Sequence, residues 1–539
     1  MTAVLESPPT VPSRLHRARA RWAWGLGAVA VVLWSLAGAG LFSGNVVNPA
    51  GRAQFGRFAG TALSPALDAA FLQVLASSAL ITIAYAVLGA ALAVLLGALG
   101  AVLVARTTWG RRRLGWTLAR GALAVPRGLH EAVWGLLLVN VLGLDPWVGV
   151  LAIGLAYGAV TAKVFADLLD EVPRGSYDAL LAAGSGRIAA ALYGLLPPAS
   201  GGLLSYAFYR LECAVRSAVV LGLIGAGGLG YQLALSFSSL RWEQVWSCVY
   251  ALAALCLLAD VGGRAVRRRL AAPRTPGDRL ARDRVLTAAV LTTLALVAWS
   301  WWYLAISPAT LFAERTREQL GYVLGAAWPP DTDGGLLRSI AVLAVDTVQM
   351  SVIAIALATV GTVALAGLAA QPAGPTGPGR RLTGTAVRMG LLLLRAVPPP
   401  VWALVVLFVL LPGVLPGAVA LGLYTLGVLG RLAAEATEEL DPRPRAALAA
   451  LGAGPAAGWL YGVLPGATGP VLAYALYRWE VAIRDSVLVG LLGAGGLGAL
   501  LASRVGAFDW AAVTTILIAL VLLTLAVDLV SARARAALR

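Results

Sequence analysis

The chain has 539 residues, of which 59% are hydrophobic and 13% are charged, and its mean hydropathy is +0.81. No soluble core could bury so much apolar surface, so composition excludes a soluble globular protein and indicates a polytopic all-α membrane protein. The net charge of +16 could suggest nucleic-acid binding. The basic residues instead cluster between apolar runs, as the positive-inside pattern requires, so we expect no nucleic-acid partner.

The first half of the chain predicts six membrane spans and a cytoplasmic N-terminus. Basic residues precede an apolar run at 22–41, which resembles a signal peptide but is long enough to span, so we expect a retained first helix. A loop at 42–68 with a short surface helix should lie outside, and the arginines at 106 and 111–113 mark a return to the cytoplasm. The remaining spans are expected at 69–105, 121–143, 147–169, around 209–230 and at 243–263.

The second half repeats this plan after a linker. Residues 264–284 contain eight arginines and two prolines without apolar periodicity, which indicates a cytoplasmic linker between a first unit, 1–263, and a second unit, 285–539. An outside segment is expected at 305–336 and an inside loop at 371–387. The spans are expected near 285–304, 337–370, 388–411, 415–437, 464–492 and 509–531, which makes about twelve in total with both termini cytoplasmic.

An internal repeat explains the similar plans of the two halves. Residues 209–230 return as 477–498, an offset of 268, with fourteen of 22 positions identical. The offset holds upstream, where Trp134 matches Trp402 and Pro197 matches Pro465. We therefore infer one duplicated and fused unit. Six spans per unit would give both copies the same orientation, related by an axis along the membrane normal.

A pair of segments too polar to span the membrane ends each time at Leu-Pro before a span. These segments are 171–197 and 439–465, and each predicts a short Ala-rich helix, a glycine turn and a second short helix. An ordinary amphipathic loop helix is the alternative, but two copies in register argue against it. The residues of interest are Asp178, Ala179, Ala182, Gly184 and Gly186 in the first copy, and Arg445, Ala446, Ala447, Ala450, Gly452 and Gly454 in the second.

These segments resemble the EAA coupling loop of the permeases of ATP-binding-cassette (ABC) importers. In that family the loop lies in a groove of the ATPase subunit and transmits its closure to the membrane helices. Asp178 stands where the family usually has Glu, and Ala446 takes that place in the second copy. The resemblance therefore implies an ATPase-coupling role for both loops, with a second loop that either grips the ATPase more weakly or depends on other residues such as Arg443 and Arg445.

Charged residues also lie within the repeated span. Glu212 and Arg216, like Glu480 and Arg484, are four residues apart and so share one helix face. Counting from Pro197 at about 1.5 Å per residue places the first pair roughly 22–28 Å from the inner surface. Such charges are costly in lipid and usually face a partner or a cavity. Either each Glu–Arg pair braces two helices, or the arginines line a passage for an anion while the glutamates hold them, with Ser217 and Asp485 beside them.

The repeat ends in GAGGLG in both halves, at Gly225, Gly227, Gly228 and Gly230 and at Gly493, Gly495, Gly496 and Gly498. The pattern satisfies GxGxxG, but a membrane helix precedes it and no βαβ unit surrounds it, which excludes a dinucleotide fold. Glycines at this density let a helix break or two helices pack closely. We expect a gate at the outer end of the passage.

Together, the EAA loop and the YRxExxxRxxxxxGxxGAGGLG pattern resemble the phosphonate-type permeases within the methionine-importer-type superfamily. The resemblance covers nearly the whole chain, twice. It implies an importer of phosphonate, phosphite, hypophosphite or phosphate in a bacterial plasma membrane. The implied partners are two copies of a separate ATPase, which binds ATP and Mg²⁺, an extracytoplasmic binding protein, and membrane lipid, with no cofactor in this chain.

Two other classes of protein remain as alternatives. An ion-coupled secondary transporter would need carboxylates near the midplane and gives no reason for a duplicated EAA loop. A membrane enzyme would need a metal or nucleophile cluster within a span, and no such pattern is present. The chain also lacks GxxxxGK[ST], so ATP hydrolysis would belong to another subunit. His130 fits a packed structural histidine better than a proton carrier.

Overall fold

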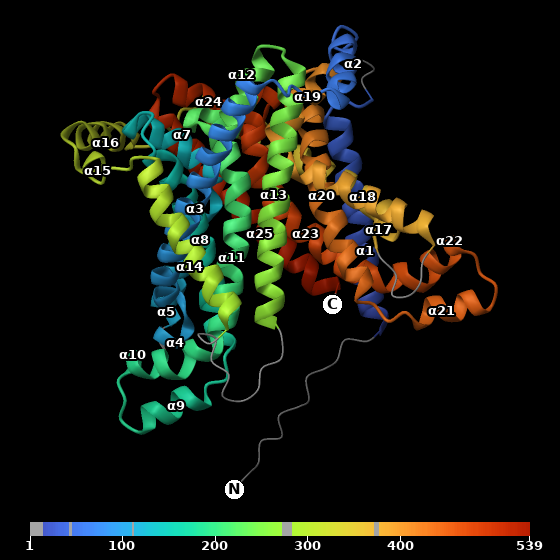
Figure 1. Ribbon diagram of the computed structural model, residues 1–539, viewed down its shortest axis with the longest axis horizontal. Coiled ribbons are helices and arrows are strands. Elements are labelled where there is room, and N and C mark those ends of the chain that lie inside the picture. The colour runs from blue at the N-terminus through green and yellow to red at the C-terminus, as the bar shows by residue number, and fades with distance from the viewer. Residues whose placement is uncertain (1–13, 43–45, 110–112, 272–282, 371–376, 539) are drawn as a thin grey trace.

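The computed structural model describes residues 14–42, 46–109, 113–271, 283–370 and 377–538 (Figure 1). Within these ranges the chain is helical, with one isolated antiparallel bridge between Val47 and Leu410, so the predicted all-α class is confirmed. Arg111, Arg112, most of the expected linker and residues 371–376 of the expected inside loop lie outside the described residues.

Two kinds of helical segment are long and apolar enough to cross a membrane. Seven are single helices: α3 (Ala69–Val104), α8 (Trp147–Glu171), α13 (Trp242–Ala271), α14 (Arg284–Tyr303), α17 (Gly334–Ala369), α20 (Val414–Glu438) and α25 (Trp510–Leu538). Four are bent pairs, which bring the candidates to eleven among the described residues. The apolar part of α1 (Arg14–Gly38), Trp22–Gly38, is shorter, and α1 would be the twelfth span that the sequence predicts.

Two expected spans are broken rather than continuous. Helices α5 (Arg113–Ala122) and α6 (Ala124–Gly128) turn by 80° into α7 (Glu131–Leu142), and α18 (Pro378–Ala396) turns by 98° into α19 (Pro399–Val409). The spans predicted at 121–143 and 388–411 therefore each correspond to a bent helix pair, and the sequence pattern does not show the bend. Pro398–Pro400 break the second helix, because proline cannot donate a backbone hydrogen bond and disfavours helix before it. In the first, His130 is extended and caps α7.

The two halves exchange their first helices. Helix α1 packs against α17 of the second half, where Leu36 contacts the core around Met350. Helix α14 packs against α3 of the first half, and the Trp147 indole donates to the Ser307 carbonyl at 2.8 Å. The halves therefore interlock instead of lying apart. Helix α13 also continues to Ala271, so residues 264–271 are helical where the sequence predicts linker.

The predicted loop helices project from one end of the bundle. Helices α9 (Gly175–Ala182) and α10 (Arg187–Ala190) form one projection, and α21 (Arg443–Ala450) and α22 (Pro455–Ala457) form the other. Both lie at the lower end in Figure 1, whereas α12 (Gly228–Ser238) and α24 (Gly496–Gly506) lie at the opposite end. The halves thus have the same orientation, as the even number of predicted spans requires.

Three short helices belong to the segments that the sequence places outside. Helix α2 (Arg52–Gly60) lies in the 42–68 segment and packs against α19. Helices α15 (Ala309–Phe312) and α16 (Glu314–Ala327) lie in the 305–336 segment, and α16 packs against α7 and α25. Figure 1 shows these helices toward the end that carries α12 and α24.

Candidate functional site

A cavity of about 180 Å³ lies between the two halves. In the first half its walls come from the break before α7, from α8 and from α11 (Leu196–Leu221). In the second half they come from the break before α19, from α20 and from α23 (Leu464–Val489). Most lining positions are matched at the 268-residue offset: His130 with Pro398, Glu131 with Pro399, Ala156 with Tyr424, Tyr209 with Tyr477, Arg210 with Arg478, Arg216 with Arg484 and Ser217 with Asp485. The cavity therefore lies on the pseudo-twofold axis.

Positive charge dominates the cavity lining. The lining contains five arginines, Arg127, Arg210, Arg216, Arg478 and Arg484, and two carboxylates, Glu131 and Asp485. Guanidinium groups remain charged in proteins and match oxyanions in shape. The wall chemistry therefore suits a small anion.

The first-half carboxylate, Glu131, is held by hydroxyl groups. Its Oε1 accepts a hydrogen bond of 2.5 Å from Ser217, and the Ser217 hydroxyl lies 2.5 Å from that of Tyr157. Only 7% of Glu131 is exposed. Glu131 is thus buried and already bonded by its own half.

The histidine beside it bridges the two halves. His130 caps α7, and its Nδ1 accepts a hydrogen bond of 3.1 Å from the Ala132 amide. A ring nitrogen that accepts carries no proton in neutral histidine, so Nε2 carries it. Nε2 lies 3.5 Å from Oδ1 of Asp485. These contacts support the expected structural role of His130 and give it a partner across the interface.

The two matched arginines deepest in the wall differ in their surroundings. The Nε–H of Arg210 donates a hydrogen bond to the Tyr206 hydroxyl, and the guanidinium lies over the Tyr157 and Tyr209 rings. Arg478 lies over the Tyr424 ring, but its Nε and Nη2 have no hydrogen-bond partner within the described part of the chain. Its closest carboxylate oxygen, Oδ2 of Asp485, is 3.8 Å from Nη2.

The expected pairing of each glutamate with the arginine four residues later is wrong. Glu212 pairs with Arg267 of α13 at 3.3 Å, and Glu480 pairs with Arg535 of α25 at 2.5 Å. Both partners follow the 268-residue offset. The glutamates therefore brace the last helix of their own half, while Arg216 and Arg484 face the cavity. The spacing on one helix face could not reveal a partner on another helix.

Reciprocal ion pairs also join the halves beside the cavity. Arg127 pairs with Asp528 at 3.4 Å, and its counterpart Arg395 pairs with Asp260 at 3.1 Å. Asp260 is also within 2.9 Å of Arg264 and 2.7 Å of Arg431. The aspartates were not singled out from the sequence, although both interrupt apolar runs at matched positions.

The GAGGLG segments break their helices as the glycine content predicts. Helix α11 bends by 56° into α12, and α23 bends by 63° into α24. Gly227 and Gly495 have φ of +91° and +84°, a region that favours glycine. A Cβ on Gly230 would lie 1.9 Å from the Val219 carbonyl oxygen.

The hydroxyls of Thr82 and Thr347 fix these breaks from neighbouring helices. Thr82 accepts a hydrogen bond of 2.8 Å from the Leu229 amide, and Thr347 accepts one of 3.0 Å from the Leu497 amide. The sequence offered a weak signal for them, a threonine within each long apolar run. Their offset of 265 hid the match, because it differs from the 268 that holds downstream.

The loop residues singled out from the sequence lie at the opposite end of the molecule. Asp178, Ala179 and Ala182 lie on α9, and Arg445–Ala447 and Ala450 lie on α21. Gly184 and Gly452 form the turns with φ of +85° and +84°. The helix–turn–helix form expected for both loops is confirmed, and most of the two loop surfaces are exposed.

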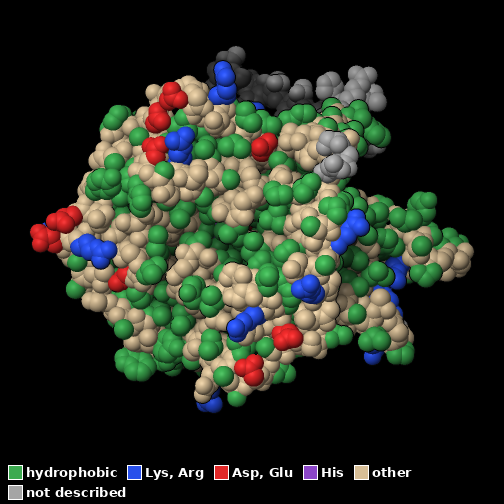
Figure 2. All heavy atoms as spheres, turned by 90° about the horizontal axis from the view of Figure 1, so that it is seen from above, with side chains coloured by type: hydrophobic (Ala, Val, Ile, Leu, Met, Phe, Trp, Pro, Cys, Tyr) green, Lys and Arg blue, Asp and Glu red, His purple; other side chains and the backbone are tan. Residues whose placement is uncertain are grey.

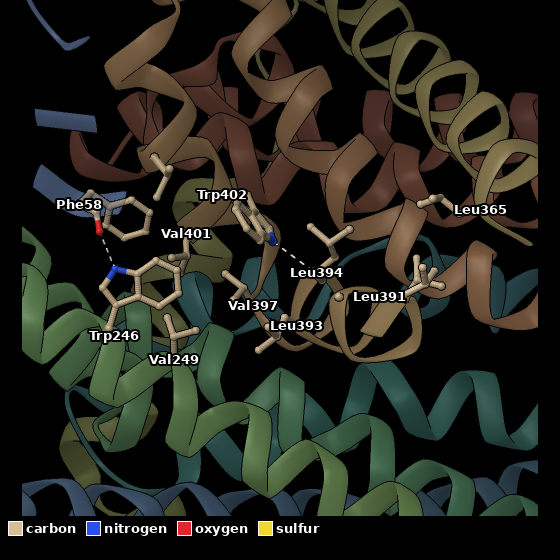
Figure 3. Close-up of a pocket in the computed structure, with 13 residues that line it drawn as sticks. Phe58, Trp246, Val249, Leu365, Leu391, Leu393, Leu394, Val397, Val401 and Trp402 are labelled. Carbon is tan, nitrogen blue, oxygen red and sulfur yellow. Dashed lines mark hydrogen bonds between the residues drawn. The ribbon is translucent and has the colours of Figure 1, made fainter. Parts of the chain in front are cut away.

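A larger cavity, about 390 Å³, has a different character (Figure 3). It lies between α13 and the α18–α19 bend, and apolar side chains such as Val249, Leu391 and Val401 line it. Its indole groups are already bonded, Trp246 to the Phe58 carbonyl and Trp402 to the Leu394 carbonyl. It offers no charge to a polar solute.

Figure 2 shows the end that carries α12 and α24, where the middle has no charged side chains and the charged side chains lie around it, some in small groups of both signs.

Comparison with known proteins identifies relatives along most of the chain. The family model described as binding-protein-dependent transport system inner membrane component matches twice, at residues 110–272 and 363–539. The phosphate-import permease protein PhnE of Mycolicibacterium smegmatis is 28% identical over 84% of this chain and 83% of its own length. The phosphite transport system permease protein PtxC of Stutzerimonas stutzeri is 33% identical over 44% of this chain and 84% of its own.

A further relative matches a shorter part of the chain. The putative cryptic phosphonate transport system permease protein PhnE2 of Escherichia coli K12 is 34% identical over 22% of this chain and 95% of its own length. No solved structure matches the chain at a significant level.

Proposed function

The chain belongs to the family of inner membrane components of binding-protein-dependent transport systems, and from this premise we propose that it is the permease of an ATP-driven importer for a phosphonate or a related phosphorus oxyanion. Phosphite, hypophosphite and phosphate are the related solutes. Two permease units fused in one chain, 1–263 and 285–539, would supply both halves of the passage. The named relatives act in phosphate, phosphite and phosphonate transport systems, which supports this solute class.

The observation that carries the proposal is the arginine-rich cavity on the pseudo-twofold axis. A passage for one solute between two related halves must follow that axis, and most lining positions of the cavity occur as matched pairs. Five arginines against two carboxylates favour an anion. In this proposal Arg216 and Arg484 attract the solute, while Ser217 and Asp485 make the walls of the two halves different.

The two projecting loops are the proposed contacts of the ATPase. Their helices α9 and α21 would each dock on one copy of a separate ATPase subunit that binds ATP and Mg²⁺. This assignment makes the lower end in Figure 1, where α1 begins and α25 ends, cytoplasmic. An extracytoplasmic binding protein would deliver solute to the other end, where the glycine breaks of α12 and α24 form the gate.

The test uses the full chain reconstituted in lipid with its ATPase and its binding protein. ATP hydrolysis would be recorded with the binding protein empty and then loaded with methylphosphonate, phosphite, phosphate or sulfate. We expect stimulation by at least one phosphorus oxyanion, together with its uptake into the vesicles. An Arg216→Gln/Arg484→Gln double variant should lose uptake while binding-protein docking remains.

Other outcomes would select among the alternatives. Stimulation by a loaded binding protein carrying an unrelated solute would keep the importer and reject the phosphorus substrate. Solute movement down an ion gradient without the ATPase would favour the secondary transporter, for which a duplicated coupling loop has no purpose.

A further inference from the structure

Asp485 is a buried carboxylate that faces the cavity without a hydrogen bond. Only 12% of its side chain is exposed, and it lines the cavity. Its oxygens lie 3.5 Å from Nε2 of His130 and 3.8 Å from Nη2 of Arg478, and no hydrogen bond reaches either oxygen from the described residues. A buried carboxylate left in this state is costly, which indicates that it acts on something that enters the cavity.

Arg478 presents the opposite chemistry at the same place. Its side chain is 10% exposed, and two of its nitrogens, Nε and Nη2, lack hydrogen-bond partners. Buried guanidinium nitrogens nearly always find acceptors. Arg478 and Asp485 therefore form a loose ion pair in the cavity wall, with Nη2 and Oδ2 3.8 Å apart and no hydrogen bond between them, so the hydrogen-bonding capacity of both side chains is incompletely used.

A carboxylate beside an anion passage repels most anions but can favour one kind. An ionised carboxylate only accepts hydrogen bonds, so it can bind an anion only through an O–H group of that anion. Monoprotonated phosphate and phosphonate carry both a P–O⁻ group and a P–O–H group, whereas sulfate at neutral pH carries no O–H. The phosphate group of a phosphodiester lipid headgroup also lacks a P–O–H group.

Resting on the proposed function, we propose that Asp485 and Arg478 form a selectivity site inside the membrane that accepts oxyanions bearing a P–O–H group. Arg478 donates to the P–O⁻ oxygens, and Asp485 accepts from the P–O–H group. Sulfate, phosphodiesters and the hypophosphite anion, which has P–H bonds but no P–O–H group at neutral pH, leave Asp485 facing an unprotonated group and are rejected, so this inference narrows the proposed solutes to phosphonate, phosphite and phosphate. This selection adds to that of the binding protein.

The two halves divide these tasks unequally. Ser217, the counterpart of Asp485, already donates to Glu131, and Arg210, the counterpart of Arg478, is already bonded by Tyr206. In the first half these polar side chains therefore form hydrogen bonds with each other, whereas the matching side chains of the second half do not. The whole cavity has a volume of about 180 Å³, which exceeds the roughly 10–15 Å³ that one water needs by this measure.

The experiment measures binding by the full chain alone, in nanodiscs and without the binding protein. Equilibrium dialysis with radiolabelled phosphate and sulfate in mildly acidic buffer gives the preference, and methylphosphonate and dimethyl phosphate serve as competitors. We expect phosphate to bind at least about tenfold more tightly than sulfate, because a site that bonds a substrate O–H rejects analogues without it. Methylphosphonate should compete and dimethyl phosphate should not.

Two variants test the assigned partners. The Asp485→Asn amide can donate to an unprotonated oxygen, so the preference for phosphate over sulfate should fall at least about tenfold. Arg478→Gln should weaken the binding of both phosphate and sulfate and leave the ratio of their affinities unchanged. Asp509→Asn, which removes an outer ion pair to Arg504, is the matched control and should change neither.

The results separate this inference from the proposed function. Equal binding of phosphate and sulfate by the wild-type chain, or an unchanged ratio in Asp485→Asn, would overturn the selectivity site even if the full importer carries a phosphorus oxyanion. Failure of the full importer to carry any phosphorus oxyanion would instead overturn the proposed function. The wild-type comparison needs no variant, so it stands even if a substitution impairs folding.

Discussion

The two halves of the chain agree in their mechanical parts and differ in the cavity wall. Both brace the glutamate of the repeat against an arginine of the last helix, Glu212 with Arg267 and Glu480 with Arg535. Both fix their glycine break with a threonine hydroxyl from a neighbouring helix. At the cavity, by contrast, the first half has Glu131 and Ser217 where the second has Pro399 and Asp485.

This difference shows which constraints each region carries. In the proposed transport cycle the two halves move together, which requires the same braces and hinges in both, so duplication preserves them. A single small solute on the axis needs only one set of contacts, so the walls can diverge. Substitutions at mechanical positions should therefore act alike in both halves, and substitutions at the wall should not.

Substitutions in the ion pairs between the halves should cause the largest loss of stability, and the loss should differ between the two halves. Asp260 is 2% exposed and contacts three arginines, whereas its counterpart Asp528 is 30% exposed and forms an ion pair with Arg127 alone among the described residues. Asp260→Asn removes the carboxylate that pairs with Arg395, whose side chain is 11% exposed, and should cost about 3–5 kcal/mol, as removal of one partner of a buried pair does. Asp528→Asn should cost clearly less. Thermal unfolding in detergent measures both, and equal losses would contradict this reading.

Alanine substitutions at the glycine breaks should cause the second largest loss of stability. A Cβ on Gly230 would meet the Val219 carbonyl oxygen at 1.9 Å, and one on Gly498 would meet the Val487 carbonyl oxygen at 2.1 Å. Backbone cannot move aside as a side chain can, so either alanine substitution should cost about 1–3 kcal/mol and slow uptake. Gly262→Ala on α13 is the control, because nothing lies within 4 Å of the added atom. A stable, fully active Gly230→Ala chain would refute the tight hinge.

The threonine contacts should give a smaller and equal loss in both halves. Thr82→Val keeps the shape of the side chain but leaves the buried Leu229 amide without its acceptor, at a cost of about 1–2 kcal/mol. Thr347→Val should match it through Leu497. Unfolding midpoints and uptake rates check both variants. A loss confined to one half would mean that the hinges are not equivalent.

The sequence predicted the parts of the fold that depend on local pattern. Apolar length and arginine clusters located most spans, and the constant offset revealed the duplication. No signal in the sequence indicated the bend before α7, at His130. The prolines Pro398–Pro400 gave only a hint of the bend before α19, because local pattern does not say whether a proline kinks a span or ends it.

Contacts between helices lay beyond the sequence. The four-residue spacing suggested Glu212 with Arg216, but Arg267 lies 55 positions later and approaches only in the folded bundle. The exchange of α1 and α14 between the halves left no mark in composition. The cavity residues Arg216, Arg484 and Asp485 were found from the sequence because charge in an apolar run is itself a signal, and Ser217 was found as the counterpart of Asp485 in the repeat.

The smallest expected effect concerns the coupling loops, where the halves differ in exposed charges that include Asp178 in the first and Arg443 and Arg445 in the second. Asp178 lies in the first turn of α9, and Ala446 takes its place on α21. An exposed charge contributes at most about 1 kcal/mol to a contact, so Asp178→Ala should lower stimulated ATP hydrolysis less than about fivefold without changing unfolding. Ala446→Asp should leave hydrolysis the same or raise it, and Asp178→Asn should fall between. If the second loop depends instead on Arg445, then Arg445→Ala should lower hydrolysis as much as Asp178→Ala does. If neither Asp178→Ala nor Ala446→Asp changes stimulated ATP hydrolysis, then neither loop uses this position. The ATPase would then recognise the shape of the helix pair alone.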